Sequence, residues 1–253
     1  FVPADPMDFV VAMLEVVSYN FEEMPDERET LPINIQQWGM LDRARTERLL
    51  GSDLPANDTF EGAYVQALLD ELPAESLLFS ANSMSIRAID EFYFKRGKRL
   101  TVLANRGLNG IDGTVSSALG AAQEFEQTVF LTGDLTLLHD LNALALQGEM
   151  LLRESQGSRR PSVVIVLLNN NGGAIFDMLP QQSEDPYFER LFLTPHQIDF
   201  CTAAQAFGVS ATKVESLEAF RSVLKEQLGN PGISLIEVPV PLQGVKERYG
   251  RYR

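Results

Sequence analysis

Two apolar runs in the middle of the sequence each end in small or oxygen-bearing residues. The run 128–131 leads to Gly133 and Asp134, and the run 163–168 leads directly into three asparagines and two glycines at 169–173. Ligands of open parallel sheets bind at the carboxyl ends of the strands, where such residues would meet. Carboxylate and amide oxygens suit a magnesium ion that also holds a phosphate, and the amino end of a following helix favours the same anion. The spacing therefore predicts a site for magnesium and phosphate.

Two arginines follow two further apolar runs. Arg87 comes shortly after the run 77–79, and Arg106 comes just after the run 100–104 and precedes a glycine-containing stretch at 107–113. An arginine guanidinium is a planar fork that suits carboxylates. Either arginine alone is readily interpreted as a surface residue paired with an acid. Both together beside a metal site favour a substrate that carries carboxylate groups.

Helix-like and strand-like segments alternate from Phe60 onwards. A helix is expected over 135–152, and Asp199 and Ser216 are expected to cap two later helices. This alternation predicts an α/β fold with a doubly wound, mainly parallel six-stranded sheet, helices on both faces and a helical linker segment before it. The strands are expected at 77–79, 100–104, 128–131, 163–168, 209–214 and 233–238.

The expected domain boundaries lie at two polar stretches. A helix at 35–50 and a turn cluster at 52–59 make residues 1–57 the end of a preceding domain with a linker. Residues 58–242 are expected to form the main α/β domain. Residues 243–253 are expected to form a C-terminal tail, of which residues 246–253 are basic and are interpreted as disordered.

The composition is that of an acidic globular protein. The formal net charge of −14 argues against nucleic acids and anionic membrane surfaces as partners. No apolar run approaches the length of a membrane span. Cys201 is the single cysteine, so an internal disulfide is excluded, and its neighbours indicate a packed helix position rather than a nucleophile. A reducing, cytoplasmic location is therefore expected.

The glycine–aspartate pair and the asparagine run together resemble the thiamine-diphosphate-binding signature. Asp134 and Asn170 lie 36 positions apart, a longer spacing than is usual in that signature. The polar stretch 153–160 between them is interpreted as an insertion in a surface loop, where extra residues cost little.

Further segments make the resemblance more specific. Over about residues 60–240, the chain is similar to the family of 2-succinyl-5-enolpyruvyl-6-hydroxy-3-cyclohexene-1-carboxylate synthases, which are thiamine-dependent enzymes of menaquinone biosynthesis. The segments that carry this similarity are Asn82–Arg87, Asn105–Gly113, Gly133–Leu135 with Asp140–Asn142, and Asn169–Phe176.

The resemblance implies a cofactor and a metal. The cofactor is thiamine diphosphate, and the metal is Mg²⁺ or Mn²⁺ held by Asp134, Asn170 and the carbonyl of Gly172. No residue of this chain is implied as a catalytic acid or base. The other residues implied for the cofactor are Gly133, Leu135 and Thr136 along the diphosphate and Ile111 beneath the cofactor.

The implied activity is that of a transferase that decarboxylates 2-oxoglutarate and adds the succinyl semialdehyde unit to isochorismate. The family's amino-terminal pyrimidine-binding domain has no counterpart in this sequence. The chain is therefore expected to be the C-terminal, cofactor-binding part of a homodimer or homotetramer, and to be inactive alone. The residues implied for the substrates are Ser83, Arg87, Arg106, Ile175 and Phe176.

Two other interpretations stay open. An acetolactate synthase-like carboligase or decarboxylase would use the same cofactor, although Arg87 and Arg106 argue against it because pyruvate needs fewer cationic partners. A non-catalytic nucleotide-binding or cofactor-binding module would keep the fold without the reaction. His139 and His196 are interpreted as an ordinary helix residue and an ordinary loop residue.

Overall fold

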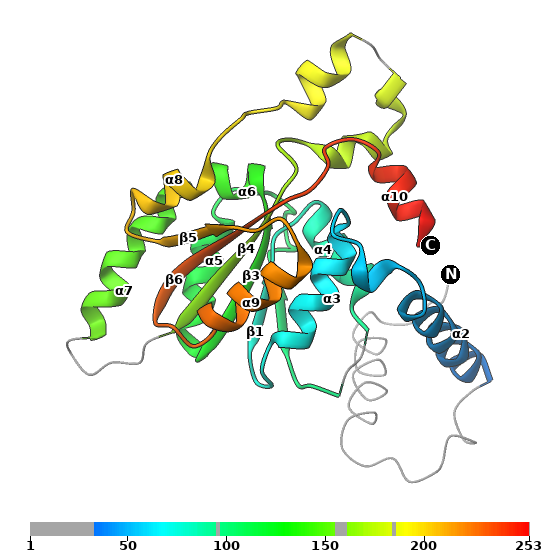
Figure 1. Cartoon of the computed structure of the whole chain (residues 1–253), viewed down its shortest axis with the longest axis horizontal. Helices are drawn as coiled ribbons and strands as arrows, with labels where there is room; N and C mark the ends of the chain where they lie inside the picture. Colours follow the sequence, from blue (N-terminus) through cyan, green and yellow to red (C-terminus); the bar gives the residue numbers. More distant parts are fainter. Residues whose placement is uncertain (1–32, 95–96, 155–160, 184–185, 253) are drawn as a thin grey trace. The chain divides into compact units, whose positions relative to one another are not determined.

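The computed structural model describes residues 33–94, 97–154, 161–183 and 186–252. The chain divides into two compact units, residues 1–48 and residues 49–253. Helix α2 (Ile33–Leu50) is the described part of the first unit and ends just inside the second (Figure 1). No helix in these described ranges is long and apolar enough to cross a membrane. Most of the polar stretch 153–160 lies outside the described residues, so its interpretation as an insertion stays a prediction.

A six-stranded, all-parallel sheet forms the centre of the second unit (Figure 1). The strands lie in the order β2-β1-β3-β4-β6-β5. The doubly wound α/β fold expected from the sequence is confirmed, and each strand lies close to its expected position. The strands are β1 (Leu77–Ser80), β2 (Thr101–Ala104), β3 (Gln127–Gly133), β4 (Ser162–Asn169), β5 (Ser210–Lys213) and β6 (Gly232–Pro239).

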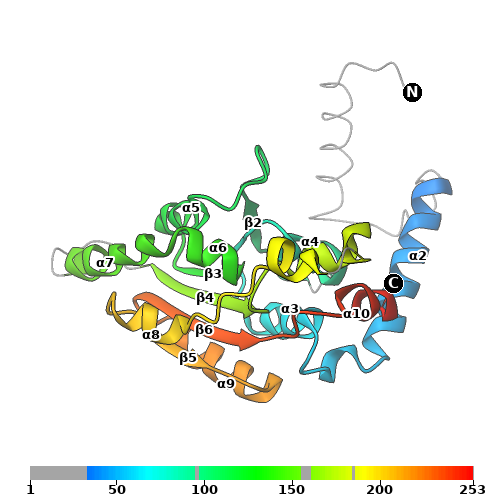
Figure 2. The same ribbon diagram turned by 90° about the horizontal axis from the view of Figure 1, so that it is seen from above.

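Alternate residues of the strands face opposite layers of helices. In β4, Val164 and Val166 pack into one apolar cluster, whereas Val163 and Ile165 pack into the other. Continuous apolar runs of this kind are typical of parallel strands that are buried on both faces. Figure 2 shows α5, α6 and α7 on one side of the sheet and α3 and α9 on the other.

The helices of each layer follow from the residues in these two clusters. The first cluster contains residues of α3 (Glu61–Glu71), α4 (Met84–Phe92), α9 (Leu217–Gln227) and α10 (Val245–Arg251). The second cluster contains residues of α5 (Thr114–Ala121), α6 (Asp134–His139), α7 (Leu146–Glu154) and α8 (Phe200–Gln205).

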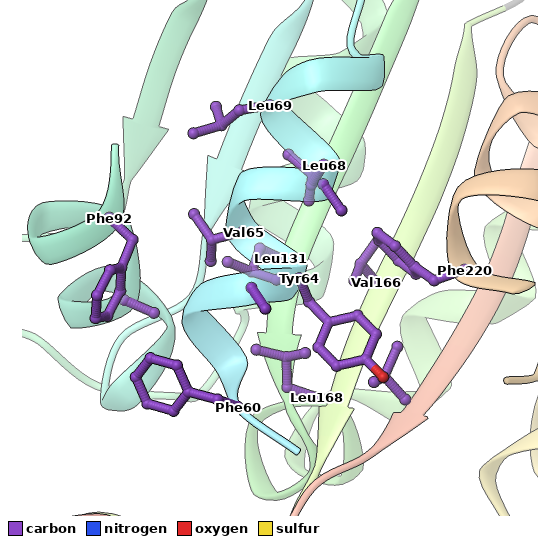
Figure 3. Packing of buried hydrophobic residues seen from close by; sticks show 14 of the residues in the cluster. Phe60, Tyr64, Val65, Leu68, Leu69, Phe92, Leu131, Val166, Leu168 and Phe220 are labelled. Atoms are coloured by element: carbon purple, nitrogen blue, oxygen red, sulfur yellow. The ribbon is translucent and has the colours of Figure 1, made fainter. Parts of the chain in front are cut away.

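Helix α3 is central to the first cluster (Figure 3). Phe60, just before α3, meets Phe92 of α4 edge to face with ring centroids 5.2 Å apart, and Tyr64 meets Phe220 of α9 in the same way at 5.3 Å. Such pairs contribute roughly 0.5–1.5 kcal/mol beyond the area that they bury. Gly62 is required here, because a Cβ would come within 2.6 Å of the Phe60 ring and 2.8 Å of the Phe92 ring. This packing fixes α4, which begins just beyond the carboxyl end of β1.

The prediction of a single helix over residues 135–152 is wrong. The structure has α6, then a 3-10 helix η3 (Leu141–Ala145), then α7. Asp140 ends α6, and its carboxylate accepts hydrogen bonds from the backbone N–H of Ser116 at 2.7 Å and from the Ser116 hydroxyl at 3.2 Å. Aspartate commonly bonds backbone groups in this way in place of continuing a helix. The break thus ties the end of α6 to the first turn of α5.

Both expected helix caps are confirmed. The Asp199 carboxylate accepts a hydrogen bond of 2.9 Å from the Thr202 N–H at the start of α8. The Ser216 hydroxyl accepts one of 3.1 Å from the Ala219 N–H at the start of α9. These bonds satisfy amide groups that the first turn of a helix leaves without an internal partner.

The interpretation of the C-terminal segment as disordered is wrong, because α10 packs into the core. Tyr249 is fully buried and meets the Phe60 ring edge to face at 5.1 Å. The Asp177 carboxylate accepts a hydrogen bond of 2.7 Å from the Val245 N–H at the start of α10. Asp177 belongs to the short helix η4 (Ala174–Met178), so α10 anchors the segment that follows the asparagine run. The boundaries expected after residues 57 and 242 stay predictions.

A buried ion pair also joins α3 to α10. Glu61 is 3% exposed, and its Oε1 lies 3.5 Å from Nη2 of Arg248. Burial raises the pKa of the Glu61 carboxyl above its ordinary value of 4.5, although the charge of Arg248 acts in the opposite direction. The pKa of Glu71, on the same helix, is shifted in the opposite direction. Burial alone would raise its pKa, but hydrogen bonds from Arg221 and Lys225 outweigh burial and lower the pKa.

We predict that Glu61→Gln changes how the free energy of unfolding depends on pH. The folded wild type holds the Glu61 proton more tightly than the unfolded chain does, so this group's stabilising contribution is complete below pH 4.5. That contribution is lost as the pH rises through the raised pKa. The variant lacks this loss, so its stability relative to the wild type should increase across that pH range in chemical denaturation.

Glu71→Gln is the matched control because the pKa of Glu71 is lowered. The Glu71 carboxylate contributes stability above pH 4.5, and this contribution is lost as the pH falls through the lowered pKa. The control variant should therefore lose stability relative to the wild type as the pH rises. The same pH trend in both variants would contradict the prediction.

Candidate functional site

The polar segments of the sequence meet where the winding of the sheet changes direction. After β1 the chain forms α4 on the face of the first cluster, and after β3 it forms α6 on the opposite face. Because β1 and β3 are neighbours, connections that leave them toward opposite faces open a crevice between their carboxyl ends. Strand β4 borders β3 on the other side, so the loop after β4 reaches the same crevice.

A cleft of about 180 Å³ lies at this crevice. Its walls also include Glu61 and Asn82, which the sequence did not single out as site residues. The cleft thus brings together residues from segments that are far apart in the chain. Ten of the twelve site residues expected from the sequence line it: Ser83, Ile111, Gly133, Asp134, Leu135, Thr136, Asn170, Gly172, Ile175 and Phe176.

Asp134 places a buried carboxylate directly after β3. The residue is 2% exposed, its Oδ1 accepts a hydrogen bond of 2.7 Å from the Leu135 N–H, and its Oδ2 accepts one of 2.8 Å from the Gly172 N–H. Burial raises the pKa of this carboxyl, whereas the two N–H donors and His196 act in the opposite direction. A carboxylate in such surroundings is stabilised by any cation that can reach it.

The loop after β4 brings further oxygens to Asp134. The N–H of Gly172 donates both to Asp134 Oδ2 and, at 3.1 Å, to Asn170 Oδ1, so these two oxygens lie near each other. Gly172 has a φ of 154°, and a Cβ there would come within 2.2 Å of the Leu193 carbonyl oxygen, so a side chain does not fit. The Asp134 carboxylate, the Asn170 amide oxygen and the backbone carbonyl of Gly172 are oxygen donors of the kind that suits Mg²⁺.

Arg87 and Arg106 differ from the other expected residues because they do not line the cleft. Both are exposed. Arg87 Nη1 donates a hydrogen bond of 2.7 Å to the Ser83 carbonyl, and Arg106 Nη1 donates one of 2.7 Å to Asn82 Oδ1. Since Ser83 and Asn82 are wall residues, each arginine is bonded to the edge of the cleft. Asn82 also donates to two carbonyls of the loop 105–110, which fastens that loop.

The apolar wall of the cleft comes from two loops. Ile111 is half-buried in the loop before α5, and its carbonyl accepts a hydrogen bond of 3.0 Å from the Thr114 hydroxyl. Ile175 and Phe176 lie in η4, and the Phe176 ring meets Phe192 edge to face at 5.8 Å. The cleft therefore has an oxygen-rich end beside Asp134 and an apolar wall.

The sequence analysis missed two residues of this site, His196 and Glu61, because no neighbouring residue in the sequence indicates their role. His196 was interpreted as an ordinary loop residue, but its Nε2 lies 3.2 Å from Asp134 Oδ2. Glu61 begins a helix, as many acids do, and its Arg248 partner is 187 positions away. Both depend on partners far along the chain, which spacing rules do not reveal. His139 is exposed on α6, in agreement with its interpretation as an ordinary helix residue.

Cys201 on α8 is not an activated nucleophile. Its Sγ lies 3.5 Å from Oε2 of the buried Glu237. Burial raises the pKa of the thiol to about 12, and the charge of Glu237 acts in the same direction. The thiol therefore stays protonated at neutral pH, as a packed helix position implies.

Curated relatives of the chain are named 2-succinyl-5-enolpyruvyl-6-hydroxy-3-cyclohexene-1-carboxylate synthase. The protein from Desulfitobacterium hafniense is 44% identical over 209 residues, which are 83% of this chain and 36% of that protein. The protein from Geobacillus thermodenitrificans is 44% identical over 199 residues, 79% of this chain and 32% of that protein. The chain thus spans about a third of the length of the relatives that it matches.

Solved structures share the fold at low sequence identity. Benzoylformate decarboxylase from Polynucleobacter necessarius matches with a TM-score of 0.56 and 20% identity over 73% of this chain and 33% of that one. A putative thiamin diphosphate-dependent enzyme from Mycobacterium smegmatis matches with a TM-score of 0.55 and 18% identity over 74% of this chain and 32% of that one. These likenesses support the architecture alone.

A family model matches more than half of the chain. The model describes the C-terminal TPP binding domain of thiamine pyrophosphate enzymes, thiamine pyrophosphate being another name for thiamine diphosphate, and it covers residues 86–238. These residues begin in α4 and end in β6, so they include the loops after β2, β3 and β4. The chain therefore belongs to the thiamine pyrophosphate enzyme family and carries its C-terminal TPP-binding domain.

Proposed function

We propose that this chain is the cofactor-binding part of a 2-succinyl-5-enolpyruvyl-6-hydroxy-3-cyclohexene-1-carboxylate synthase of menaquinone biosynthesis. The complete enzyme, a cytoplasmic homodimer or homotetramer, would decarboxylate 2-oxoglutarate and transfer the four-carbon unit to isochorismate. The observation that carries the proposal is an oxygen-donor loop at one edge of the sheet, together with Arg87 of α4 and Arg106 of the loop after β2, each bonded to the edge of the cleft. The names of the relatives support the same assignment.

The residues at the oxygen-rich end of the cleft fit a divalent metal. Asp134, Asn170 and the carbonyl of Gly172 would hold Mg²⁺ or Mn²⁺, both of which accept oxygen ligands. Supporting this assignment, the Asp134 and Asn170 oxygens converge on one N–H, and burial of Asp134 would favour a nearby cation.

The middle of the cleft fits the cofactor. When bound, thiamine diphosphate supplies the carbon nucleophile on which a 2-oxo acid loses carbon dioxide. Gly133, Leu135 and Thr136 would lie along the diphosphate, because they flank Asp134 at the carboxyl end of β3 and line the cleft. Ile111 would support the rings from the apolar wall.

The two arginines at the edge of the cleft suit acidic substrates. Arg87 and Arg106 would bind the carboxylates of 2-oxoglutarate and isochorismate, and Ser83 would donate a hydrogen bond beside them. Ile175 and Phe176 would cover the apolar part of the substrates, because they line the apolar wall of the cleft. In the complete enzyme, closure over these groups would exclude water and strengthen the charge contacts.

A carboligase of the acetolactate synthase type is the second candidate. One observation favours it: neither Arg87 nor Arg106 lines the cleft. Each arginine donates a hydrogen bond to a neighbouring residue, Arg87 to the Ser83 carbonyl and Arg106 to Asn82 Oδ1. A site for pyruvate would leave both arginines in these roles. Turnover of 2-oxoglutarate against pyruvate by the complete enzyme distinguishes the two candidates.

We predict that Asp134→Ala abolishes magnesium-dependent binding of thiamine diphosphate. The variant removes a metal ligand, and the diphosphate would then lack its main counter-charge. Isothermal titration calorimetry with and without Mg²⁺ measures the effect. Asp90→Ala, at an exposed position of α4, is the control and should bind as the wild type does. Undiminished binding by Asp134→Ala would remove this metal assignment.

We predict that Arg106→Ala in a complete enzyme mainly weakens the use of the acidic substrates. The loss should be roughly 2–5 kcal/mol in kcat/KM, because a closed site would desolvate the charge pair. The affinity for thiamine diphosphate should change little. Arg99→Ala is the control, since exposed Arg99 pairs with Glu75 before β2 begins, away from the cleft. An equal loss of cofactor affinity would assign Arg106 to the diphosphate or to the fold.

We predict that the 253-residue chain alone has no synthase activity and binds thiamine diphosphate weakly. The far side of the cofactor would stay open to water, where electrostatic stabilisation is weak. Exposed Val102, Leu103 and Leu108 at the β2 edge and in the following loop should also promote self-association. An assay with 2-oxoglutarate, isochorismate, Mg²⁺ and cofactor, with light scattering in parallel, checks both points. Steady product formation by a monodisperse chain would contradict the prediction.

A further inference from the structure

His196 is in contact with the carboxylate that we assign to the metal. Its side chain is 10% exposed, and its Nε2 lies 3.2 Å from Asp134 Oδ2. The ring is also packed edge to face against Phe200 of α8, with centroids 5.5 Å apart. The imidazole is thus held between the core of the second cluster and the oxygen-rich end of the cleft.

The hydrogen bonds of the ring define which nitrogen carries the proton. Nδ1 of His196 accepts a hydrogen bond of 3.1 Å from the Ile198 N–H, so this nitrogen has no proton of its own. A neutral imidazole then carries its proton on Nε2, which is the nitrogen that faces Asp134. Nε2 is buried, makes no hydrogen bond among the described residues, and has the Asp134 Oδ2 acceptor 3.2 Å away.

The segment that carries His196 is hydrogen-bonded at two points to the loop after β4, which contains Asn170 and Gly172. The Leu193 carbonyl accepts a hydrogen bond of 2.7 Å from the Gly173 N–H, and the Gln197 N–H donates one of 2.8 Å to Asn171 Oδ1. These two bonds flank His196 on both sides in the sequence. The position of the imidazole is therefore set by the same loop that presents Asn170 and Gly172, and not by a free surface segment.

We propose that His196 is a positioning residue for the metal: its Nε2–H holds Asp134 Oδ2 so that the remaining lone pairs of the carboxylate point into the cleft. The proposal rests on the metal site assigned above. A donor that orients a ligating carboxylate commonly contributes a factor of roughly 10–100 in metal affinity. His196 contacts the ligand and not the substrate, so it acts on the reaction only through Asp134.

The test compares metal affinity in four variants of the full-length protein, with thiamine diphosphate present: Asp134→Ala, which removes the assigned ligand, and three histidine variants. Mn²⁺ is titrated in, and the free ion is read from its electron paramagnetic resonance signal. His196→Phe keeps a planar ring without a donor and should weaken Mn²⁺ binding roughly 10–100-fold. His196→Gln keeps an N–H donor and should restore most of the affinity. His139→Phe, at the exposed histidine of α6, is the matched control and should bind as the wild type does.

A second measurement reads the His196 ring directly in the wild type. In the wild type, the ¹⁵N chemical shifts of the His196 ring should report a proton on Nε2 and none on Nδ1, and these shifts should move when Mg²⁺ binds. The His196 signals are those absent from the His196→Gln spectrum. A proton on Nδ1, or shifts that ignore Mg²⁺, would overturn the proposal.

The outcomes also separate this proposal from the function on which it rests. If Asp134→Ala binds Mn²⁺ as the wild type does, the metal site is wrong and the role of His196 is wrong with it. If Asp134→Ala loses Mn²⁺ while His196→Phe keeps full affinity, the metal site stands and the role of His196 is wrong. An equal loss in His196→Phe and His196→Gln would show that ring packing matters and the donor does not.

Discussion

Burial of the Asp134 carboxylate is the constraint on which the site depends. A carboxylate that is 2% exposed needs polar partners, and here the N–H groups of Leu135 and Gly172 donate to it, while Nε2 of His196 lies 3.2 Å from Oδ2. The Gly172 contact requires the β4 loop to approach so closely that a side chain there would meet the Leu193 carbonyl. One buried charge thus determines the residue type at Gly172, the path of the loop and the placement of the segment before α8.

The sheet supplies the rigidity that this arrangement needs. Strands β3 and β4 pair over seven positions from Gln127 to Gly133 and are buried on both faces, so their carboxyl ends are fixed relative to each other. The apolar wall is held differently: η4 is bonded through Asp177 to α10, whose Tyr249 packs against Phe60. The polar end of the cleft therefore depends on the sheet, whereas the apolar wall depends on the C-terminal helix.

The sequence predicted those features whose cause is local. Apolar runs located the strands, and Asp199 and Ser216 cap helices through residues three positions later. Features whose cause lies far along the chain were missed. Asp140 breaks the expected helix because its partner is Ser116, and the basic C-terminal residues form a helix because Tyr249 reaches Phe60. Spacing rules describe one element at a time, so contacts between elements of this kind escape them.

The charge of the cleft also links the metal to the cofactor. Asp134 and a diphosphate are both anionic, so a diphosphate placed against a bare carboxylate would be repelled across a poorly solvated gap. A divalent cation between them reverses the sign of this interaction and at the same time favours the ionised form of Asp134, against the effect of burial. Metal and cofactor should therefore bind with positive coupling, each raising the affinity for the other by the same factor. On the proposed assignment, the oxygen-rich end would be a site for the pair, which neither ligand alone would satisfy.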